Sequence, residues 1–451
     1  MFFTISNITL SGVRRDKQIA RENLAQGYNL DQVIAERNLP VHLLGSVSVS
    51  IIDRKVKMGL NLTFEEAFVG MCYVIASTNK IFLERFGKVL GQAYGVEILS
   101  HDRAIAIGAA FLNLMALKES IFGLTSEEIA GLVAAGLMDT VFSLYIPEVL
   151  ETCGMGGDKG FGVNGSRTKS VNVSTLSSFV LAAAGCVVAK HGSYANSTVV
   201  GSTDSLELFG ASTTPSSIGK IEDMLRGNKF SYIDAHLCKT LHDLSHLIMM
   251  ETINHVIGPM TPPFSKGTAL KKIMGVNEKV SPREVAKAYA QLDKLGIQKN
   301  AGVIVVAGLS KVVSGLPEDL SDRQLRDLVI LDEVSPFSTF ISVSVGENYV
   351  GDYIITPADF GIEITPEEIQ VIGNSEIIHQ SNVLAIKGEH KSLADYLAMN
   401  AALGLYLSKY EITSSGLDRD ALKECFVICR ETITNGKAYE NLCAFVKDSN
   451  V

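Results

Sequence analysis

The sequence predicts an α/β fold: a small helical-bundle domain and a larger α/β domain with a central mixed sheet flanked by helices. Three observations predict it. Helical periodicity with capping residues dominates before residue 149, a Gly-, Ser- and Thr-rich texture begins at Cys153, and short β-branched runs follow. We expect an amino-terminal extension at 1–60, a helical domain at 61–148 to which part of 210–250 contributes, and the α/β domain at 149–451.

Three helices are predicted in the first part of the chain. In LTFEEAFVGMCYVIAS, Thr63 and Glu66 have the spacing of a capping box, and apolar residues then recur at helical intervals. A second helix is expected over 104–117. LTSEEIAGLVAAGL begins a third helix, with Thr125 as its cap and Glu128 at the box position.

The remaining elements are predicted from alternation and from glycine boundaries. SVNVST is expected to be a strand, and FVLAAAGCVVAKHG a helix that leads into a short strand. GVIVVAG, from Gly302, has the composition of a buried strand. ISVSVGENYVGDYIIT alternates like an antiparallel hairpin with its turn at 346–348, and a helix-rich tail begins at Leu393.

Composition restricts the class of protein. The chain has 451 residues, is 47% hydrophobic and carries a net charge of -9, so it can bury a large core and has no global basic field for nucleic acid. Its 7 cysteines are scattered, as in a protein with reduced thiols. The most apolar run, 179–189, is about half the ~20 residues of a membrane-spanning helix. We expect a soluble, cytoplasmic protein that binds neither nucleic acid nor membrane.

A glycine-rich stretch is the first candidate site. Gly154, Gly156 and Gly157 precede Asp158, and they remove side chains where the backbone must approach a large group. Consecutive backbone N–H groups in such a turn can bind an anion such as phosphate. Taken alone, the stretch is equally compatible with a tight turn.

Two further segments are candidates. Lys190-His191-Gly192-Ser193 places a cation and an imidazole at the end of a predicted strand, where phosphate could bind. Asp332-Glu333 in LDEVSP places two adjacent carboxylates beside a proline, and Mg2+ prefers such oxygen ligands. In isolation, a surface turn and a solvated acidic turn are the simpler interpretations of the two segments.

Together the segments resemble the anthranilate phosphoribosyltransferase family, in which GTGGD, N-x-S-T, KHGNRA and a DE pair occur in this order. Here they read GMGGD, NVST, KHGSYA and LDEVSP. GPMTPP at 258–263, ITPADFG and the segment 387–407 also resemble family segments. The resemblance covers most of the chain from about Leu62 onward.

The resemblance implies Mg2+-dependent transfer of a 5-phosphoribosyl group from phosphoribosyl pyrophosphate (PRPP) to a nitrogen of a small aromatic or heterocyclic acceptor. It also implies a homodimer joined through the helical domain, and PRPP binding by 149–451. The implied metal ligands are Ser174, Asp332 and Glu333, and the implied catalytic residues are His191, Lys190 and Asp158. The implied substrate-binding residues are Gly154, Gly156, Gly157, Asp158, Asn172, Ser174, Thr175, Lys190, His191, Gly192, Ser193, Thr198 and His246.

The sequence departs from the family mainly where the acceptor would bind. Ser193 and Tyr194 replace the Asn and Arg of KHGNRA. The Arg that holds the anthranilate carboxylate in the family is also missing, since Ser245 or His246 falls at its position. The acceptor is therefore expected to be anthranilate-like rather than anthranilate. The longer loop between Asp158 and Asn172 carries Arg167 and Lys169, which could reach phosphates or keep the loop soluble.

Other functions remain open from the sequence. A nucleoside phosphorylase shares this fold, and a non-catalytic relative could bind nucleic acid through a local basic stripe. His242-Asp243-Leu244-Ser245-His246 imitates the zinc motif HExxH, but it has the shorter Asp in place of Glu and no evident third ligand. The adjacent carboxylates and the KHG triplet favour the transferase.

Overall fold

The structure is a computed structural model that describes residues 15–161, 169–195, 199–250, 252–412 and 416–451. A mixed sheet at its centre has the strand order β3-β2-β1-β4-β5-β7-β8, with β6 beside β5. The first five strands run parallel, β6 and β7 are antiparallel to β5, and β8 is antiparallel to β7. The strands are β1 (Glu148–Gly154), β2 (Val188–Gly192), β3 (Phe230–Asp234), β4 (Ala269–Gly275), β5 (Asn300–Leu309), β6 (Val329–Leu331), β7 (Thr339–Val345) and β8 (Asn348–Ile355).

Both faces of the sheet are buried, which explains why its strands are rich in Val and Ile. On β5, Val303 and Val305 join the core on one side, whereas Ile304 and Val306 join the core on the other side. This alternation follows from the two-residue period of a strand, and helices on both faces make every position apolar. The predicted strand at GVIVVAG and the predicted hairpin are confirmed.

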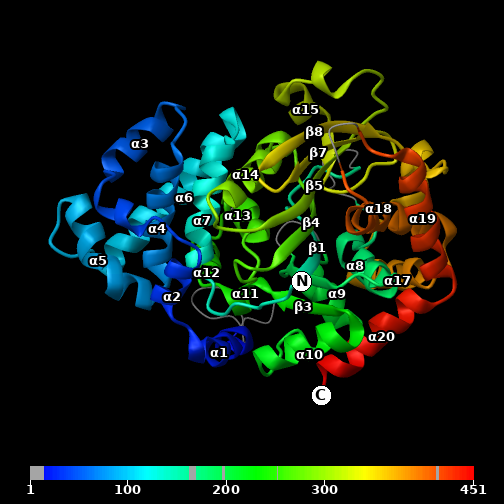
Figure 1. Cartoon of the computed structure of the whole chain (residues 1–451), viewed down its shortest axis with the longest axis horizontal. Coiled ribbons are helices and arrows are strands. Elements are labelled where there is room, and N and C mark those ends of the chain that lie inside the picture. The colour runs from blue at the N-terminus through cyan, green and yellow to red at the C-terminus, as the bar shows by residue number, and fades with distance from the viewer. Residues whose placement is uncertain (1–14, 162–168, 196–198, 251, 413–415) are drawn as a thin grey trace.

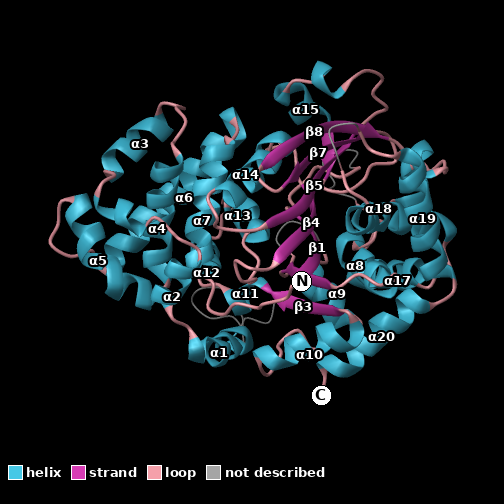
Figure 2. Cartoon of the chain, viewed as in Figure 1, coloured by secondary structure: helices cyan, strands magenta, loops and turns pink. Residues whose placement is uncertain are grey.

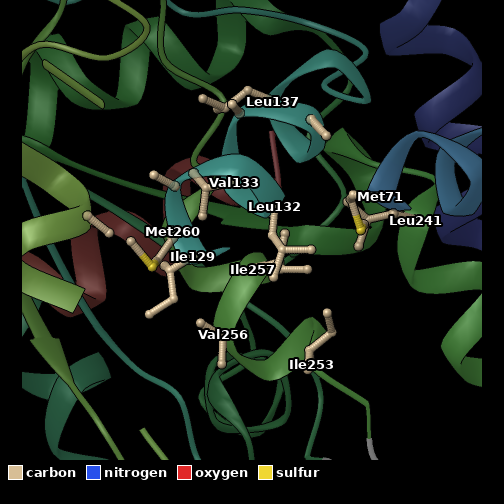
Figure 3. Close-up of a cluster of buried hydrophobic side chains, with 14 of the residues drawn as sticks. Met71, Ile129, Leu132, Val133, Leu137, Leu241, Ile253, Val256, Ile257 and Met260 are labelled. Atoms are coloured by element: carbon tan, nitrogen blue, oxygen red, sulfur yellow. The ribbon is translucent and has the colours of Figure 1, made fainter. Parts of the chain in front are cut away.

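One face of the sheet is covered by the amino-terminal helices (Figure 1 and Figure 2). Both predicted capping boxes are present, at Thr63 with Glu66 and at Thr125 with Glu128. Figure 3 shows the apolar cluster between these helices, in which Leu132 and Ile257 face each other. The helices of this layer are α1 (Arg15–Leu24), α2 (Leu30–Glu36), α3 (Val49–Lys57), α4 (Phe64–Thr78), α5 (Lys80–Tyr94), α6 (His101–Phe122), α7 (Ser126–Met138), α12 (Leu241–Ile248), α13 (Asn254–Met260) and α14 (Pro282–Lys294).

The opposite face is covered mainly by carboxy-terminal helices, with the apolar helix α18 against β4 and β5. Short helices connect the strand ends, and α15 lies beyond β8 at the top of Figure 1. These helices are α8 (Val173–Ala183), α9 (Ser202–Leu208), α10 (Ile218–Asn228), α11 (Ala235–Cys238), α15 (Asp322–Leu328), α16 (Pro366–Ile369), α17 (Ser375–Ile386), α18 (Lys391–Lys409), α19 (Arg419–Thr434) and α20 (Lys437–Ser449).

The structure corrects the prediction for SVNVST. This segment is not a strand, because α8 begins at Val173 and buries its apolar side chains against β1 and α18. Val173 and Thr175 belong to the first turn of this buried helix, where tertiary packing overrides strand propensity. The second predicted helix is confirmed as α6, which is longer than predicted and extends over His101–Phe122. By length and composition alone α6 could cross a membrane, a property that it shares with core helices of soluble proteins.

Candidate active site

The glycine loop follows β1 and closes onto Asp332. Gly156 and Gly157 have φ angles of +66° and +71°, a backbone conformation that favours glycine. The Gly156 N–H donates to Oδ2 of Asp332 at 2.8 Å. A Cβ atom at Gly154 would lie 2.1 Å from the same oxygen, so glycine is required there by space. The loop and the acidic pair, 176 residues apart in sequence, therefore form one site.

Two buried carboxylates in this site share one cation. Nζ of Lys169 lies 2.9 Å from Oδ1 of Asp158 and 2.6 Å from Oδ1 of Asp332. Burial raises the pKa of Asp158 to about 6. Although burial acts in the same direction on Asp332, Lys169 and the Gly156 amide lower the pKa of that carboxyl. The ammonium group thus marks a place that suits a positive charge.

The same oxygens fit Mg2+. Among the described residues, no three His, Cys, Asp or Glu side chains gather as a metal site. Mg2+ is commonly held by one or two carboxylates together with substrate phosphates and water, so the chemistry of Asp158 and Asp332 fits the ion. The ammonium of Lys169 lies between these two carboxylates, where their negative charge also favours a metal cation.

Glu333 has a different partner from Asp332. Its Oε2 accepts a hydrogen bond from the Tyr396 hydroxyl on α18 at 3.2 Å. Burial raises the pKa of Glu333 to about 8, so it is mostly protonated at neutral pH in the absence of a further cation. The adjacent acids therefore have different environments, as expected for neighbouring side chains that point apart.

Lys190 brings the end of β2 into contact with the site. It lies on β2, which is parallel to β1, and its side chain is 1% exposed. Nζ donates to the Thr152 carbonyl at 3.0 Å and to Oγ of Ser174 at 3.2 Å. Burial lowers the pKa of Lys190 to about 8. Ser174 lies in the first turn of α8, so the lysine and the helix start meet at the carboxyl ends of β1 and β2.

The other predicted donor residues support this arrangement. Oδ1 of Asn172 accepts from Asn382 at 2.8 Å, and its Nδ2 donates to the Val200 carbonyl at 2.9 Å. Oγ1 of Thr175 donates to Oγ of Ser202 at 3.1 Å. These bonds fix the start of α8 against α9 and α17.

His191 lies on the side of β2 opposite to Lys190. Its Nε2 is 3.5 Å from Sγ of Cys238, and burial lowers its pKa well below the usual value, so the ring is neutral. Gly192 ends β2, and Oγ of the following Ser193 donates to the carbonyl of the next residue at 3.1 Å. Thr198 lies outside the described residues.

His246 is not part of the glycine-loop cluster. It lies on α12, and its Nε2 is 2.9 Å from Nε2 of His236. Nδ1 of His236 is 2.8 Å from Oδ1 of Asp234 at the end of β3. Burial and the neighbouring His236 lower the pKa of His246 to about 4, against the opposing effect of nearby carboxylates.

Several residues of the site were not predicted. Asn277 follows β4 and donates from Nδ2 to the Gly156 carbonyl at 2.9 Å. A polar residue after a buried parallel strand is a signal that could have indicated it. Asn382 and Tyr396 come from α17 and α18, far along the chain, and no local pattern marks them. The contacts of α1 with β3 and α12 were not predicted either.

Comparisons with known proteins agree with this geometry. The family described as "Glycosyl transferase family, a/b domain" matches residues 147–314. The anthranilate phosphoribosyltransferase of Bacillus cereus (strain AH820) is 31% identical over 347 residues, which are 76% of this chain and 87% of that protein. The one from Oceanobacillus iheyensis is 29% identical over 353 residues, covering 77% and 90% of the two chains.

Solved structures show the same fold. The enzyme from Thermus thermophilus matches with a TM-score of 0.61 and 24% identity, covering 89% of this chain and 99% of that one. The Saccharomyces cerevisiae enzyme in complex with PRPP and Mg matches with a TM-score of 0.59 and 19% identity, covering 93% and 98%. The predicted fold class and the predicted enzyme class, a pentosyltransferase, are confirmed. Because it aligns at 31% identity with 87% of such a relative, the chain belongs to the anthranilate phosphoribosyltransferase family.

Proposed function

We propose that this protein transfers the 5-phosphoribosyl group of PRPP, with Mg2+, to a nitrogen of an aromatic or heterocyclic acceptor. One observation carries the proposal. The glycine loop after β1, the buried carboxylates Asp158 and Asp332, and Lys190 with Ser174 meet at the carboxyl ends of adjacent parallel strands. Ligands of open α/β sheets bind at this edge.

The part of the site proposed to bind PRPP provides groups for a pyrophosphate and a sugar. The turn at Gly154, Gly156 and Gly157 brings backbone close to a ligand, and Lys190 adds a buried cation whose present partners are neutral oxygens. Placing an anion beside Lys190 stabilises its charged form, which burial otherwise disfavours. Asn172 and Thr175 hold the start of α8, at which a phosphate is also favoured.

The proposed Mg2+ ligands are Ser174, Asp332 and Glu333, which the family resemblance implies. Asp158 is added to them, because its carboxylate shares one cation with Asp332. When bound, the ion supplies positive charge that stabilises the departing pyrophosphate. The bond between the anomeric carbon and the pyrophosphate oxygen breaks, pyrophosphate leaves with the electron pair, and the acceptor nitrogen forms the new bond. The residues of this chain hold the donor and carry charge at the oxygens where it develops.

The relatives support both substrates. The yeast protein has been solved in complex with PRPP and Mg and, separately, with 4-fluoroanthranilate. In this chain Ser193 and Tyr194 stand where the family pattern has an Asn and an Arg, and Ser245 or His246 stands where it has the Arg that holds the anthranilate carboxylate. The acceptor is therefore proposed to be anthranilate-like and not anthranilate.

A calorimetric titration of PRPP with and without Mg2+ tests the donor half. We expect Mg2+-dependent binding to the wild type, a loss of at least tenfold in affinity for Asp332→Asn, and no change for the matched variant Asp223→Asn. Asp223 is an exposed acid on α10 whose ion-pair partner is Arg226. Absence of PRPP binding under both conditions would contradict the proposal and favour the phosphorylase or nucleic-acid-binding alternatives.

A homodimer through the helical layer is part of the proposal. Large apolar side chains are exposed on this layer, and a Cβ at Gly59 would lie 2.7 Å from the Phe122 ring, which places the end of α3 beside the end of α6. The exposed apolar residues at this place are Met58, Leu60, Leu117, Ile121 and Phe122. A second copy of the chain would remove them from water.

A further inference from the structure

Helix α1, in the amino-terminal extension, carries a lysine that is completely buried. Lys17 is 0% exposed, and its Nζ donates to the Thr213 carbonyl at 3.0 Å and also to the Thr213 hydroxyl. The same Nζ lies 3.5 Å from Oδ2 of Asp234 and 3.9 Å from Oε1 of Glu207. It also lies 5.6 Å from the centre of the Tyr194 ring. A helix that precedes the segments resembling the family thus places a charge beside Asp234 and beside Tyr194, which replaces the Arg of the family's KHGNRA segment.

Arg21, one turn further along α1, holds the next part of the same region. Its guanidinium makes two hydrogen bonds to Asp243 of α12, at 2.7 and 3.1 Å. Nη1 also donates to the Lys239 carbonyl at 2.7 Å, just after α11. Bidentate Arg–carboxylate pairs fix orientation as well as distance. Lys17 and Arg21 therefore fix β3, α11 and α12 relative to one another.

The residues fixed in this way form a hydrogen-bonded series, Asp234–His236–His246, which we call the imidazole relay. Although burial acts in the opposite direction, Lys17 and His236 hold the pKa of Asp234 well below its usual range. Asp234 is thus an ionised acceptor, and Nδ1–H of His236 donates to it at 2.8 Å. The Nε2 atoms of His236 and His246 lie 2.9 Å apart, so one of them donates and the other accepts. In the arrangement that we infer, the ring proton of His236 is the one given to Asp234, and Nε2 of His236 accepts from Nε2–H of His246.

This pattern leaves a lone pair on Nδ1 of His246. No hydrogen bond to that atom is present within the described part of the chain. The lowered pKa of about 4 keeps the ring neutral and able to accept a proton at physiological pH. The charged and titratable groups that surround the two rings are Asp234, Asp243, His242, Lys17, Arg21, Lys239 and Tyr194.

The cations of this region are all engaged by protein oxygens or sulfur. Lys17 pairs with Asp234 and Thr213, Arg21 pairs with Asp243, and Lys239 donates to the Thr261 carbonyl and lies 3.6 Å from Sγ of Cys238. The neighbouring imidazoles His191, His242 and His246 have lowered pKa values and are neutral. Among the described residues, a carboxylate on the acceptor would meet no uncommitted positive charge here, and desolvating it would be unfavourable.

We propose that α1 completes the acceptor half of the site by positioning an imidazole relay that takes a proton from an uncharged aromatic or heterocyclic amine. The inference rests on the proposed function. As the C–N bond forms and pyrophosphate leaves with the electron pair of the broken C–O bond, the nitrogen becomes cationic. Its proton passes to Nδ1 of His246. The new imidazolium is stabilised through His236 by the carboxylate of Asp234. Lys17 and Arg21 are positioning residues.

Histidine NMR tests the relay without any acceptor. Long-range 1H–15N spectra should show the Nδ1–H tautomer for His236 and the Nε2–H tautomer for His246. In Lys17→Met, the negative charge of Asp234 is no longer balanced, so the titration midpoint of His246 should rise. Arg15→Met is the matched control, because Arg15 is an exposed cation on the same helix. Identical tautomers and identical titration midpoints in Lys17→Met and the wild type would overturn the positioning role of Lys17. If Lys17→Met does not fold, the same spectra are recorded for Arg21→Met.

The acceptor class is tested with two probes of nearly equal size, 2-aminobenzamide and anthranilate. Pyrophosphate release from PRPP and Mg2+ should be stimulated more by the uncharged amide. His246→Gln should lower kcat for this release on the order of 100-fold, as expected for loss of a proton acceptor, with KM for PRPP unchanged. The wild-type kcat should also fall as His246 is protonated in acid.

The further inference and the proposed function are contradicted by different experimental results. A preference for anthranilate, no stimulation by 2-aminobenzamide, or a His246→Gln variant with wild-type kcat would overturn this inference while PRPP binding still supported the transferase. Absence of PRPP binding in calorimetry would instead overturn the proposed function and, with it, the role of the relay in transfer.

Discussion

Lys169→Met removes the one cation that the described residues place between Asp158 and Asp332. The side chains of the two acids are 1% and 6% exposed, so bulk water cannot solvate their negative charges in place of the lost ammonium group. Removing one member of a buried ion pair costs about 3–5 kcal/mol. We therefore expect Lys169→Met to lower the free energy of unfolding by about that amount in the absence of Mg2+.

Mg2+ should reverse the loss, because the ion and the ammonium compete for the same oxygens. An ion at 100 times its dissociation constant stabilises the folded state by about 2.7 kcal/mol. In the wild type the ion must displace Lys169, so the variant should bind Mg2+ more tightly and gain more stability from it.

Urea denaturation of both proteins across a Mg2+ series, followed by circular dichroism, measures this difference. Lys159→Met is the matched control, since Lys159 lies near the same loop but is exposed and donates to the Arg326 carbonyl at 3.4 Å. Equal stability of Lys169→Met and wild type without Mg2+, or a variant whose stability does not respond to Mg2+, would refute the assignment of these carboxylates to a cation site.

Gly154→Ala should abolish Mg2+-dependent PRPP binding in calorimetry with a native circular dichroism spectrum, because the new Cβ would lie 2.1 Å from Oδ2 of Asp332. His255→Gln should destabilise the protein by about 3 kcal/mol at pH 5.5 and by progressively less at higher pH. Burial disfavours the charged form of His255, but Glu119 at 3.0 Å outweighs this effect and raises the pKa of the imidazole. The stability that this ion pair contributes is therefore fully present below about pH 6.5 and is lost as pH rises through the folded pKa. Urea denaturation at several pH values measures the difference between the variant and the wild type. Phe122→Asp should convert a dimer into a monomer in light scattering, and a monomeric wild type would contradict the proposed dimer.

Local patterns were sufficient to predict a large part of the fold. Thr63 with Glu66 and Thr125 with Glu128 form their capping boxes, because each motif is satisfied within one helical turn. GVIVVAG forms a buried strand for a similar reason, since only a strand covered on both faces is apolar at every position. SVNVST misled the prediction because β-branched residues also suit a helix start that is packed between β1 and α18.

The candidate site was predictable only where glycines and charges form contiguous motifs. Gly156 and Asp332 could be paired through the family resemblance, although nothing in the local sequence shows that they are in contact. The contacts of Lys17 with Asp234 and of Arg21 with Asp243 span more than 200 residues. Such pairs depend on how α1 packs, and a single sequence does not contain that information.

Transfer itself is most directly measured with PRPP labelled with 13C at the anomeric carbon. The labelled donor, Mg2+ and 2-aminobenzamide are incubated with the wild-type protein, and the carbon is followed by NMR as pyrophosphate appears. The account predicts a new resonance for a carbon bonded to nitrogen, formed in step with pyrophosphate. Unchanged PRPP, or conversion to ribose 5-phosphate alone, would contradict it.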